Sequence, residues 1–368
     1  MIRARKTVER VEEYTPQPEG RMGMIRLDLN ENTVGCPTGL ARAVRRVITP
    51  EWCTVYPEYE KNHETLAHYF GVSPAELMMT NGVDDAIMLI CDTFVEPGDA
   101  LVIPSPTFSI YQFFHEVREG KTRAINYDGD VRLPLDTLIS AGRRARWMAL
   151  ANPNNPTGTL IPPEDLKALL RALPETLVLV DEAYFDFSGV TILPWIRRYP
   201  NLIVSRTLSK AFGLAALRIG LLFANKKLMG LMRRIHAVYA VNGLAAACAA
   251  ESVHYDKSMR SIAKTICRNR EAFCRDLDQF KIPYVPSSAN FVLTHVGPGA
   301  LEIATRLRKQ GILVRAWSNE PRLKQCLRIT IGSAPQMRRL TDALARLDRL
   351  IERRDRTAAA CETGGWFS

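Results

Sequence analysis

Residues able to do chemistry gather in four short polar clusters of the sequence. These clusters are Asn81–Asp85, Asn152–Gly158, Asp181–Tyr184 and Ser205–Gly213. Each follows a short apolar run that has the composition of a buried strand. Ligands of parallel α/β sheets bind beyond the carboxyl ends of the strands. We therefore expect the four clusters to meet at one edge of a sheet and to form a ligand site there.

The cluster Ser205–Gly213 holds Lys210, which lies on a predicted turn of small residues surrounded by hydroxyl groups. A lysine amine at such a position can reach a carbonyl compound and form a Schiff base. A single loop lysine is otherwise an ordinary solvent-facing residue. Arg218 follows eight residues later, at the start of the next predicted strand. Neighbouring hydroxyls and a guanidinium together make a phosphate site.

The other three clusters carry polar groups that suit the same ligand. A carboxylate at the tip of a buried strand, as predicted for Asp181, is costly unless a cation accompanies it, and a protonated ring nitrogen is one such cation. The amides that open the helix after Asn81 can hold a phosphate, although most helices begin with such residues for capping alone. The asparagine- and proline-rich cluster Asn152–Gly158 is, by itself, typical of a turn.

The elements that must position these clusters alternate between short strands and helices. The predicted helices include Asp84–Phe94 and Pro163–Ala172, and the predicted strands are Leu101–Ile103, Trp147–Leu150, Leu177–Val180, Leu202–Ser205 and Ile219–Phe223. This alternation predicts an α/β fold with a mostly parallel sheet that is covered by helices on both faces.

From about Ser258 the pattern changes to that of a smaller α+β domain, which the N-terminal segment is expected to join. A long charged helix precedes the predicted strand Phe291–Thr294, helix Ala300–Gln310, strands Leu313–Arg315 and Leu327–Ile331, and helix Met337–Arg353. We therefore predict a large ligand-binding domain over residues 45–255 and a small domain built from residues 1–44 and 256–356. Residues 357–368 are predicted to be a disordered tail.

Composition narrows the possible partners. The net charge of +10 favours anionic partners, but the basic residues are spread along the chain without a nucleic-acid-binding signature. The eight cysteines show no metal-like spacing, and His63 and His68 are five residues apart where a zinc helix needs four, so no metal is expected. The apolar stretch Ala237–Ala250 is shorter than the roughly 20 residues that span a bilayer. We expect it to form a packed helix in a cytoplasmic protein that does not enter a membrane.

Eight strings, in their order and spacing, resemble the class I and II aminotransferases of fold type I, and above all the histidinol-phosphate aminotransferases. They are LDLNEN (27–32), YPEY (56–59), SPTFSIY (105–111), NPNNPTG (152–158), DEAYFDF (181–187), RTLSKAFGLAALRIG (206–220), SANF (288–291) and CLRITIG (326–332). The resemblance runs from about Tyr14 to Leu350. It implies a mostly parallel seven-stranded sheet sandwiched by helices, plus a smaller α+β domain.

The resemblance also implies pyridoxal 5′-phosphate as cofactor, held as a Schiff base on Lys210. It assigns Asp181 to the ring nitrogen and Tyr184 and Asn155 to the phenolic oxygen, which makes Lys210, Asp181 and Tyr184 the catalytic residues. Phe108 would lie against the ring. The phosphate would be bound by Thr207, Ser209, Arg218, the amides of Val83 and Asp84, and Tyr56 of a second subunit, so that the active site is shared in a homodimer.

For the substrate, the resemblance implies transfer of the amino group of histidinol phosphate to 2-oxoglutarate in histidine biosynthesis. Arg315 and Arg328 match the residues that bind the substrate phosphate in this family, with Tyr14 of the other subunit and Asn30 nearby. The sequence departs from the family pattern at Thr33–Pro37 and at Val83–Asp85.

Three alternatives stay open at the level of sequence. Within the same fold they are an aminotransferase acting on aromatic or specialised-pathway amino acids, and a threonine-phosphate decarboxylase. The third is a cofactor-binding regulatory protein without turnover, which the intact set of Lys210, Asp181, Tyr184 and Arg218 and the absence of a DNA-binding extension disfavour.

Overall fold

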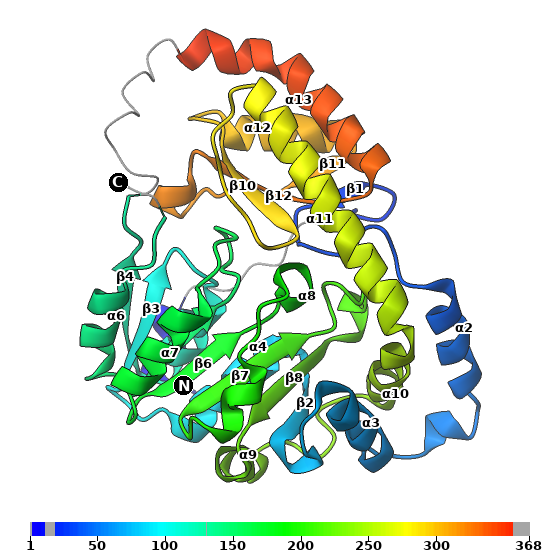
Figure 1. The fold of residues 1–368 in the computed structure, drawn as a ribbon, viewed down its shortest axis with the longest axis vertical. Helices are drawn as coiled ribbons and strands as arrows, with labels where there is room; N and C mark the ends of the chain where they lie inside the picture. Colours follow the sequence, from blue (N-terminus) through cyan, green and yellow to red (C-terminus); the bar gives the residue numbers. More distant parts are fainter. Residues whose placement is uncertain (1, 12–18, 130, 356–368) are drawn as a thin grey trace.

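The structure is a computed structural model that describes residues 2–11, 19–129 and 131–355, with side chains as far as Leu347. Its centre is a seven-stranded sheet of order β2-β8-β7-β6-β5-β3-β4 (Figure 1). Only β8 runs antiparallel to its neighbours, so the sheet is mostly parallel. The strands are β2 (Leu77–Asn81), β3 (Ala100–Ser105), β4 (Lys121–Asn126), β5 (Trp147–Ala151), β6 (Leu177–Asp181), β7 (Leu202–Thr207) and β8 (Ile219–Ala224). The predicted α/β fold is confirmed.

The sheet forms because its central strands are apolar on both sides. Every residue of β5 to β8 is buried, as expected where helices cover both faces of a parallel sheet. Alternate residues belong to different cores: Trp147 and Ala149 pack into one cluster, while Met148 and Leu150 pack into the other. The covering helices are α3 (Glu60–Phe70), α4 (Gly82–Phe94), α5 (Ile110–Val117), α6 (Leu135–Gly142), α7 (Pro163–Ala172), α9 (Lys226–Arg233) and α10 (Gly243–Ser252).

The C-terminal part contains two small sheets. One is antiparallel, of order β12-β10-β9, and in the other β1 from the N-terminal segment pairs in parallel with β11. The strands are β1 (Ile25–Leu27), β9 (Tyr284–Val285), β10 (Phe291–His295), β11 (Ile312–Val314) and β12 (Cys326–Thr330), and the helices are α11 (Asp256–Gln279), α12 (Ala300–Lys309) and α13 (Ala334–Asp355). The remaining α-helices are α1 (Lys6–Arg10), α2 (Thr38–Val47) and α8 (Phe185–Ser188).

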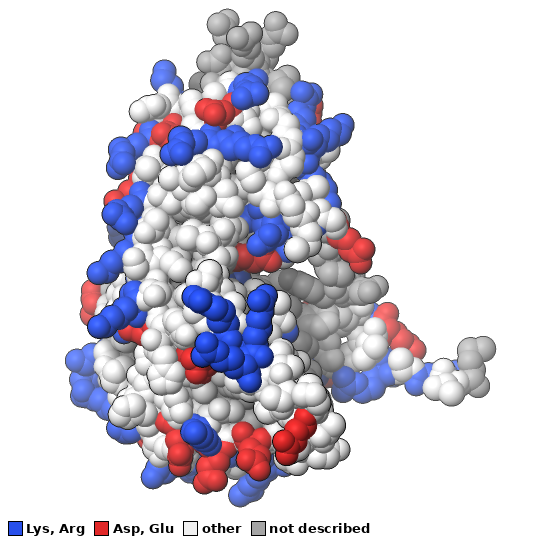
Figure 2. Space-filling view, turned by 90° about the vertical axis from the view of Figure 1, so that its right-hand side faces the viewer, with Lys and Arg blue, Asp and Glu red and all other residues white. Residues whose placement is uncertain are grey.

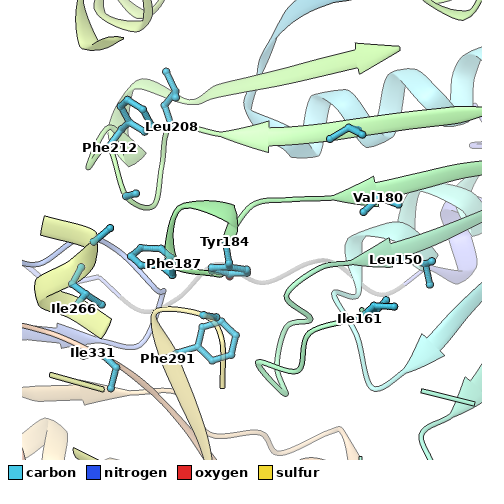
Figure 3. Close-up of a cluster of buried hydrophobic side chains, with 14 of the residues drawn as sticks. Leu150, Ile161, Val180, Tyr184, Phe187, Leu208, Phe212, Ile266, Phe291 and Ile331 are labelled. Carbon is cyan, nitrogen blue, oxygen red and sulfur yellow. The ribbon is translucent and has the colours of Figure 1, made fainter. Parts of the chain in front are cut away.

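One hydrophobic cluster continues from the large sheet into this C-terminal part (Figure 3). Its members include Val180 of β6, Ile266 of α11 and Ile331 after β12. The ring of Tyr184, which follows β6, meets the ring of Phe291 edge to face at a centroid distance of 5.1 Å. The shared core thus brings β10 and β12 close to the edge of the large sheet where the polar clusters lie.

One sequence prediction of an element was wrong in part. The stretch Ala237–Ala250 is not a helix throughout, because α10 begins only at Gly243. The side chain of Asn242 accepts a hydrogen bond from the amide of Ala245 and caps the helix there. The edge strand β4 was not predicted individually, since four of its six residues are exposed and it lacks an apolar run.

Charge is distributed broadly over the surface. Figure 2 shows Lys and Arg side chains over most of the face that it presents, with acidic side chains between them. In the part of the chain that the structure describes, no helix has the length and apolar character needed to cross a membrane.

Candidate active site

The polar clusters meet at the edge formed by the carboxyl ends of the parallel strands. Asp181 ends β6, Thr207 ends β7 and Asn81 ends β2. Because β8 runs the other way, its first residue lies at this same edge, and Arg218 immediately precedes it. Residues that are far apart in the sequence are therefore neighbours here, as the sequence predicts.

Asp181 is a buried carboxylate that is surrounded by neutral donors. Tyr111 Oη donates to Oδ2 at 2.7 Å, while Ser205 Oγ and the amide of Ala183 donate to Oδ1 at 2.9 and 3.1 Å. Burial raises the pKa of Asp181, and the hydrogen bonds from Tyr111 and Ser205 oppose that rise. Among the described residues no salt bridge involves Asp181. A protonated ring nitrogen would supply the missing cation.

Lys210 lies on the turn that follows β7, and its amine has a backbone partner from the N-terminal segment. Lys210 Nζ donates to the carbonyl oxygen of Leu29 at 3.0 Å and lies 5.9 Å from the centre of the Tyr184 ring. Burial, followed by the positive charge of Arg328, lowers the pKa of Lys210 to about 8. A fraction of neutral amine is therefore present near neutral pH, which is the form that attacks a carbonyl carbon.

Tyr184 is fixed by Asn30. Asn30 Nδ2 donates to Tyr184 Oη at 2.9 Å, and Asn30 is itself held by Thr330, whose Oγ1 accepts from its amide at 2.9 Å and donates to its side-chain oxygen at 3.0 Å. Asn30 has a positive φ of 56°, a conformation that asparagine adopts more readily than most residues. Burial raises the pKa of Tyr184, so the phenol keeps its proton.

Groups able to bind an anion lie on the Thr207–Lys210 turn and at the start of α4. Ser209 Oγ is buried and has no hydrogen-bond partner among the described residues, which is unusual for a hydroxyl. Thr207 Oγ1 accepts from the amide of Ser209 at 3.1 Å. The first amides of a helix, here those of Val83 and Asp84, have no intrahelical partners and can bind an anion.

Arg218 lies beside the start of α4 and has a constrained backbone. It has a positive φ of 52°, and its Nη2 lies 3.2 Å from Asp84 Oδ2. A Cβ added at Gly82 would come within 2.6 Å of the same guanidinium. Only glycine therefore fits at the opening of α4 with Arg218 in this position, and an orphaned hydroxyl, a guanidinium and helix amides form a cradle that fits a phosphate.

Two arginines reach the site from the C-terminal part. Arg315 and Arg328 oppose each other in an isolated antiparallel β-bridge, which is closed by two backbone hydrogen bonds of 3.1 and 2.9 Å. Arg328 donates to Asn155 Oδ1 at 2.6 Å and to the carbonyl of Asp28 at 2.7 Å. Both guanidiniums lie against the ring of Trp317, at 5.7 and 5.9 Å from its centre. Two cations thus lie on the same aromatic ring, and one of them, Arg328, is close enough to Lys210 to lower its pKa.

The remaining predicted site residues are placed differently. Phe108 follows β3, and its ring meets the ring of Tyr111 edge to face at a centroid distance of 5.6 Å. Tyr111 in turn donates a hydrogen bond to Asp181. Tyr56 is 73% exposed and stacks on Tyr239 at 4.6 Å, so it is available to a second molecule. Tyr14 lies outside the described residues, as does the tail after residue 355.

The sequence did not single out three groups that the structure adds to the site. Tyr111 ends a string that carries the family resemblance and Ser205 opens the polar cluster Ser205–Gly213, but neither pattern gives the direction of a side chain. The carbonyl of Leu29 is a backbone group, which residue type cannot reveal. Among the described residues no group of three potential ligands is arranged to hold a metal ion.

Residues 23–344 match the aminotransferase class I and II family. The chain belongs to this family. As an aminotransferase it is similar, with 34% identity, to a histidinol-phosphate aminotransferase of Caldanaerobacter subterraneus, over 87% of this chain and 92% of the relative. It is 33% identical to histidinol-phosphate aminotransferase 1 of Pseudomonas aeruginosa, over 90% of this chain and 95% of that one.

Among solved structures, the aminotransferase resembles histidinol-phosphate aminotransferase from Sinorhizobium meliloti in complex with pyridoxal-5′-phosphate. The TM-score is 0.87 and the identity is 26%, with 95% of this chain and 99% of that chain covered. The fold-type I architecture expected from the sequence is therefore confirmed over nearly the whole chain.

Proposed function

We propose that this aminotransferase uses pyridoxal 5′-phosphate to transfer the amino group of L-histidinol phosphate to 2-oxoglutarate, in histidine biosynthesis. The products would be imidazole-acetol phosphate and L-glutamate. The observation that carries the proposal is the cross-strand pair of Arg315 and Arg328, of which Arg328 acts electrostatically on Lys210. The relatives named above, which cover most of the chain, support the same substrate.

The paired arginines suit a phosphate better than a carboxylate. Directly opposed residues of antiparallel strands project to the same side of the sheet, with their Cβ atoms about 5 Å apart. Two like charges at this spacing repel each other unless an anion neutralises both. A phosphate dianion can accept from two guanidiniums at once, whereas a single arginine is enough for a carboxylate.

The residues that would hold the cofactor are those gathered at the sheet edge. Lys210 would bind it covalently, and Asp181 would keep a proton on its ring nitrogen. Tyr184 and Asn155 would hydrogen-bond its phenolic oxygen, and Phe108 would lie against its ring. Its phosphate would be bound by Thr207, Ser209, Arg218 and the amides of Val83 and Asp84. When bound, the cofactor supplies an electron-withdrawing ring that stabilises a carbanion.

The chain's own groups then perform the remaining tasks. Arg315 and Arg328 would orient the substrate through its phosphate, so that its α-carbon faces Lys210. The neutral amine of Lys210 would take the proton from that carbon, which a pKa of about 8 permits near neutral pH. Release of a ketone and reaction with a 2-oxo acid follow in the same site, which implies ping-pong kinetics.

A second copy of the chain belongs to the proposal. Tyr56, exposed on its own subunit, would reach the cofactor phosphate of the partner, and Tyr14 and Asn30 would complete the substrate site. The proposal also includes a large domain of residues 45–255 and a small domain of residues 1–44 and 256–356. Its partners are small phosphorylated amines, 2-oxo acids and a second subunit, not nucleic acid.

The experiment is a panel of amino donors in single half-reactions with wild type and Arg315→Ala. We expect histidinol phosphate to be the best donor and to lose about ten- to a hundredfold in kcat/KM with Arg315→Ala, since a charged hydrogen bond contributes roughly 1.5–3 kcal/mol. Phenylalanine and tyrosine should be affected much less. Arg306→Ala, which removes an exposed arginine of α12, is the matched control.

Two outcomes would contradict the proposal. A wild type that prefers phenylalanine or tyrosine, with Arg315→Ala lowering all donors equally, would favour an aromatic or specialised-pathway aminotransferase. Release of carbon dioxide from threonine phosphate would favour a decarboxylase.

A further inference from the structure

The segment Asp28–Glu31 contacts the active site at three consecutive residues. The carbonyl of Asp28 accepts from Arg328 at 2.7 Å, and the carbonyl of Leu29 accepts from Lys210 at 3.0 Å. The next residue, Asn30, donates to Tyr184 at 2.9 Å. A shift of this short segment would therefore move the partners of three functional side chains together.

A single guanidinium binds the two acidic side chains of this segment. Arg21 donates through Nε and Nη2 to the two oxygens of Asp28, at 3.1 and 2.7 Å. It also donates through Nη1 and Nη2 to the two oxygens of Glu31, at 3.0 and 3.1 Å. Arg21 thus bridges the two residues that flank Leu29 and Asn30. Bidentate arginine–carboxylate contacts of this kind fix geometry more firmly than single ones.

The contacts of Arg21 with Asp28 and Glu31, which we call the clamp, are largely protected from solvent. The side chain of Arg21 is 20% exposed and that of Asp28 is 6% exposed. Arg26 adds one further hydrogen bond to Glu31, at 2.9 Å, and makes none to Asp28. Of the basic residues that the structure describes here, Arg21 is the one that joins both ends of the segment.

We propose that Arg21 is a positioning residue of the active site, which holds the Asp28–Glu31 segment so that Leu29 and Asn30 keep Lys210 and Tyr184 in place. The inference rests on the proposed function only in naming Lys210 and Tyr184 as working residues. The clamp also neutralises the two carboxylates closest to Lys210 on this segment.

The electrostatics around Lys210 give a readout that a purely structural role would not produce. The charged groups that face its amine are Arg328 and Arg218, which lower its pKa, and Glu31 and Asp84, which raise it. Removing Arg21 leaves Asp28 and Glu31 less neutralised, so the pKa of Lys210 should rise. Removing the carboxylate of Glu31 should lower it.

The test is a titration of Lys210 in the protein without cofactor. The rate at which an amine-reactive anhydride labels Lys210 is measured against pH by peptide mass spectrometry. The midpoint is the pH at which labelling of Lys210 reaches half of its maximal rate. Arg21→Gln should raise this pH, and Glu31→Gln should lower it, each by on the order of half a pH unit or more. The double variant Arg21→Gln/Glu31→Gln should return towards wild type.

The second measurement is the rate of the first half-reaction with cofactor bound. Arg21→Gln should slow it about tenfold, because small displacements of reacting groups are costly, with less effect on KM. Arg21→Lys keeps the charge but cannot bridge both carboxylates, so it should leave the titration near wild type and still slow the reaction. Arg306→Gln, which breaks an exposed arginine–glutamate contact in which two guanidinium nitrogens donate to one carboxylate oxygen, should change neither.

An unchanged midpoint in Glu31→Gln, together with an unchanged half-reaction rate in Arg21→Lys, would overturn the inference, whether or not Arg21→Gln folds. The labelling needs neither cofactor nor substrate. If wild type shows no transamination but the midpoints move as expected, the proposed function fails and the clamp stands.

Discussion

Tyr111 donates its phenolic hydrogen to Asp181 at 2.7 Å, and both residues are buried. This contact joins α5 to the end of β6 and holds the carboxylate in one orientation. It also stabilises the charged form of Asp181 against the opposing effect of burial. An ionised carboxylate with a fixed direction is what a protonated ring nitrogen requires as a partner.

Asp181→Asn should preserve the fold and slow proton abstraction on the order of a thousandfold, because a neutral amide cannot keep the ring nitrogen protonated. Single-turnover kinetics of the first half-reaction measure this. Tyr111→Phe, which removes one donor and leaves the carboxylate, should raise the pKa of Asp181 and cost only about tenfold. A change of two- or threefold in Asp181→Asn would contradict the proposed role.

Lys210→Ala should lose covalent attachment of the cofactor, and the purified wild type should be yellow. Borohydride reduction followed by peptide mapping locates the attached lysine. Lys227→Ala, an exposed lysine of α9, is the control and should keep both the colour and the adduct on Lys210. A reduced adduct on another lysine would make the assignment wrong.

Lys210 should destabilise the protein when the cofactor is absent. Its folded pKa of about 8 lies below the ordinary value of 10.5, so burial of the charged amine costs stability below pH 8. The cost disappears as pH rises from about 8 to above 10.5. Lys210→Met should therefore raise the free energy of unfolding at pH 7 by up to about 3 kcal/mol, since one pKa unit corresponds to about 1.4 kcal/mol and partial exposure reduces the effect.

Denaturant unfolding of both proteins without cofactor, at pH 7 and at pH 10.5, measures this difference. A gain that is equal at the two pH values would point to better packing by methionine rather than to relief of a buried charge.

Tyr56→Phe and Lys210→Ala chains should partly complement each other when mixed into heterodimers. One of the two sites would then contain both native residues, because Tyr56 is expected to serve the neighbouring subunit. Activity of isolated heterodimers is compared with that of each parent homodimer. No recovery from verified heterodimers would place Tyr56 in its own subunit or make it a packing residue through Tyr239.

The sequence predicted the sheet and its polar edge because both depend on local patterns. Apolar runs such as Leu177–Val180 give strands, and a polar residue such as Asp181 directly after one lies at the carboxyl end. The edge strand β4 was not predicted, because solvent takes the place of apolar neighbours along it and the strand has no apolar run. The end of β7 shows the same limit: Ser205 was inside a predicted strand, yet only its pairing with Asp181 reveals its hydrogen bond.

Contacts made by the N-terminal segment were beyond sequence reasoning for another reason. Leu29 comes close to Lys210 in a segment that is placed by the parallel pairing of β1 with β11. That pairing joins residues nearly 290 positions apart, and residue type says little about so distant a partner. The start of α10 shows a third case, in which one capping residue, Asn242, outweighs an apolar stretch.

The single antiparallel strand of the large sheet has a consequence for how this enzyme could be altered. The chain leaves β7 at Thr207 and returns into β8 at Ile219, two strands that are hydrogen-bonded to each other. The connection between these two strands therefore contains both Lys210 and Arg218, which are the proposed covalent and ionic anchors of the cofactor. Insertions in this connection would change the spacing between the two anchors. The whole hairpin of β7 and β8, by contrast, could be exchanged between related proteins as one unit. In recombination of aminotransferase genes, crossovers between residues 207 and 219 should abolish cofactor binding far more often than crossovers in the loops on the opposite edge.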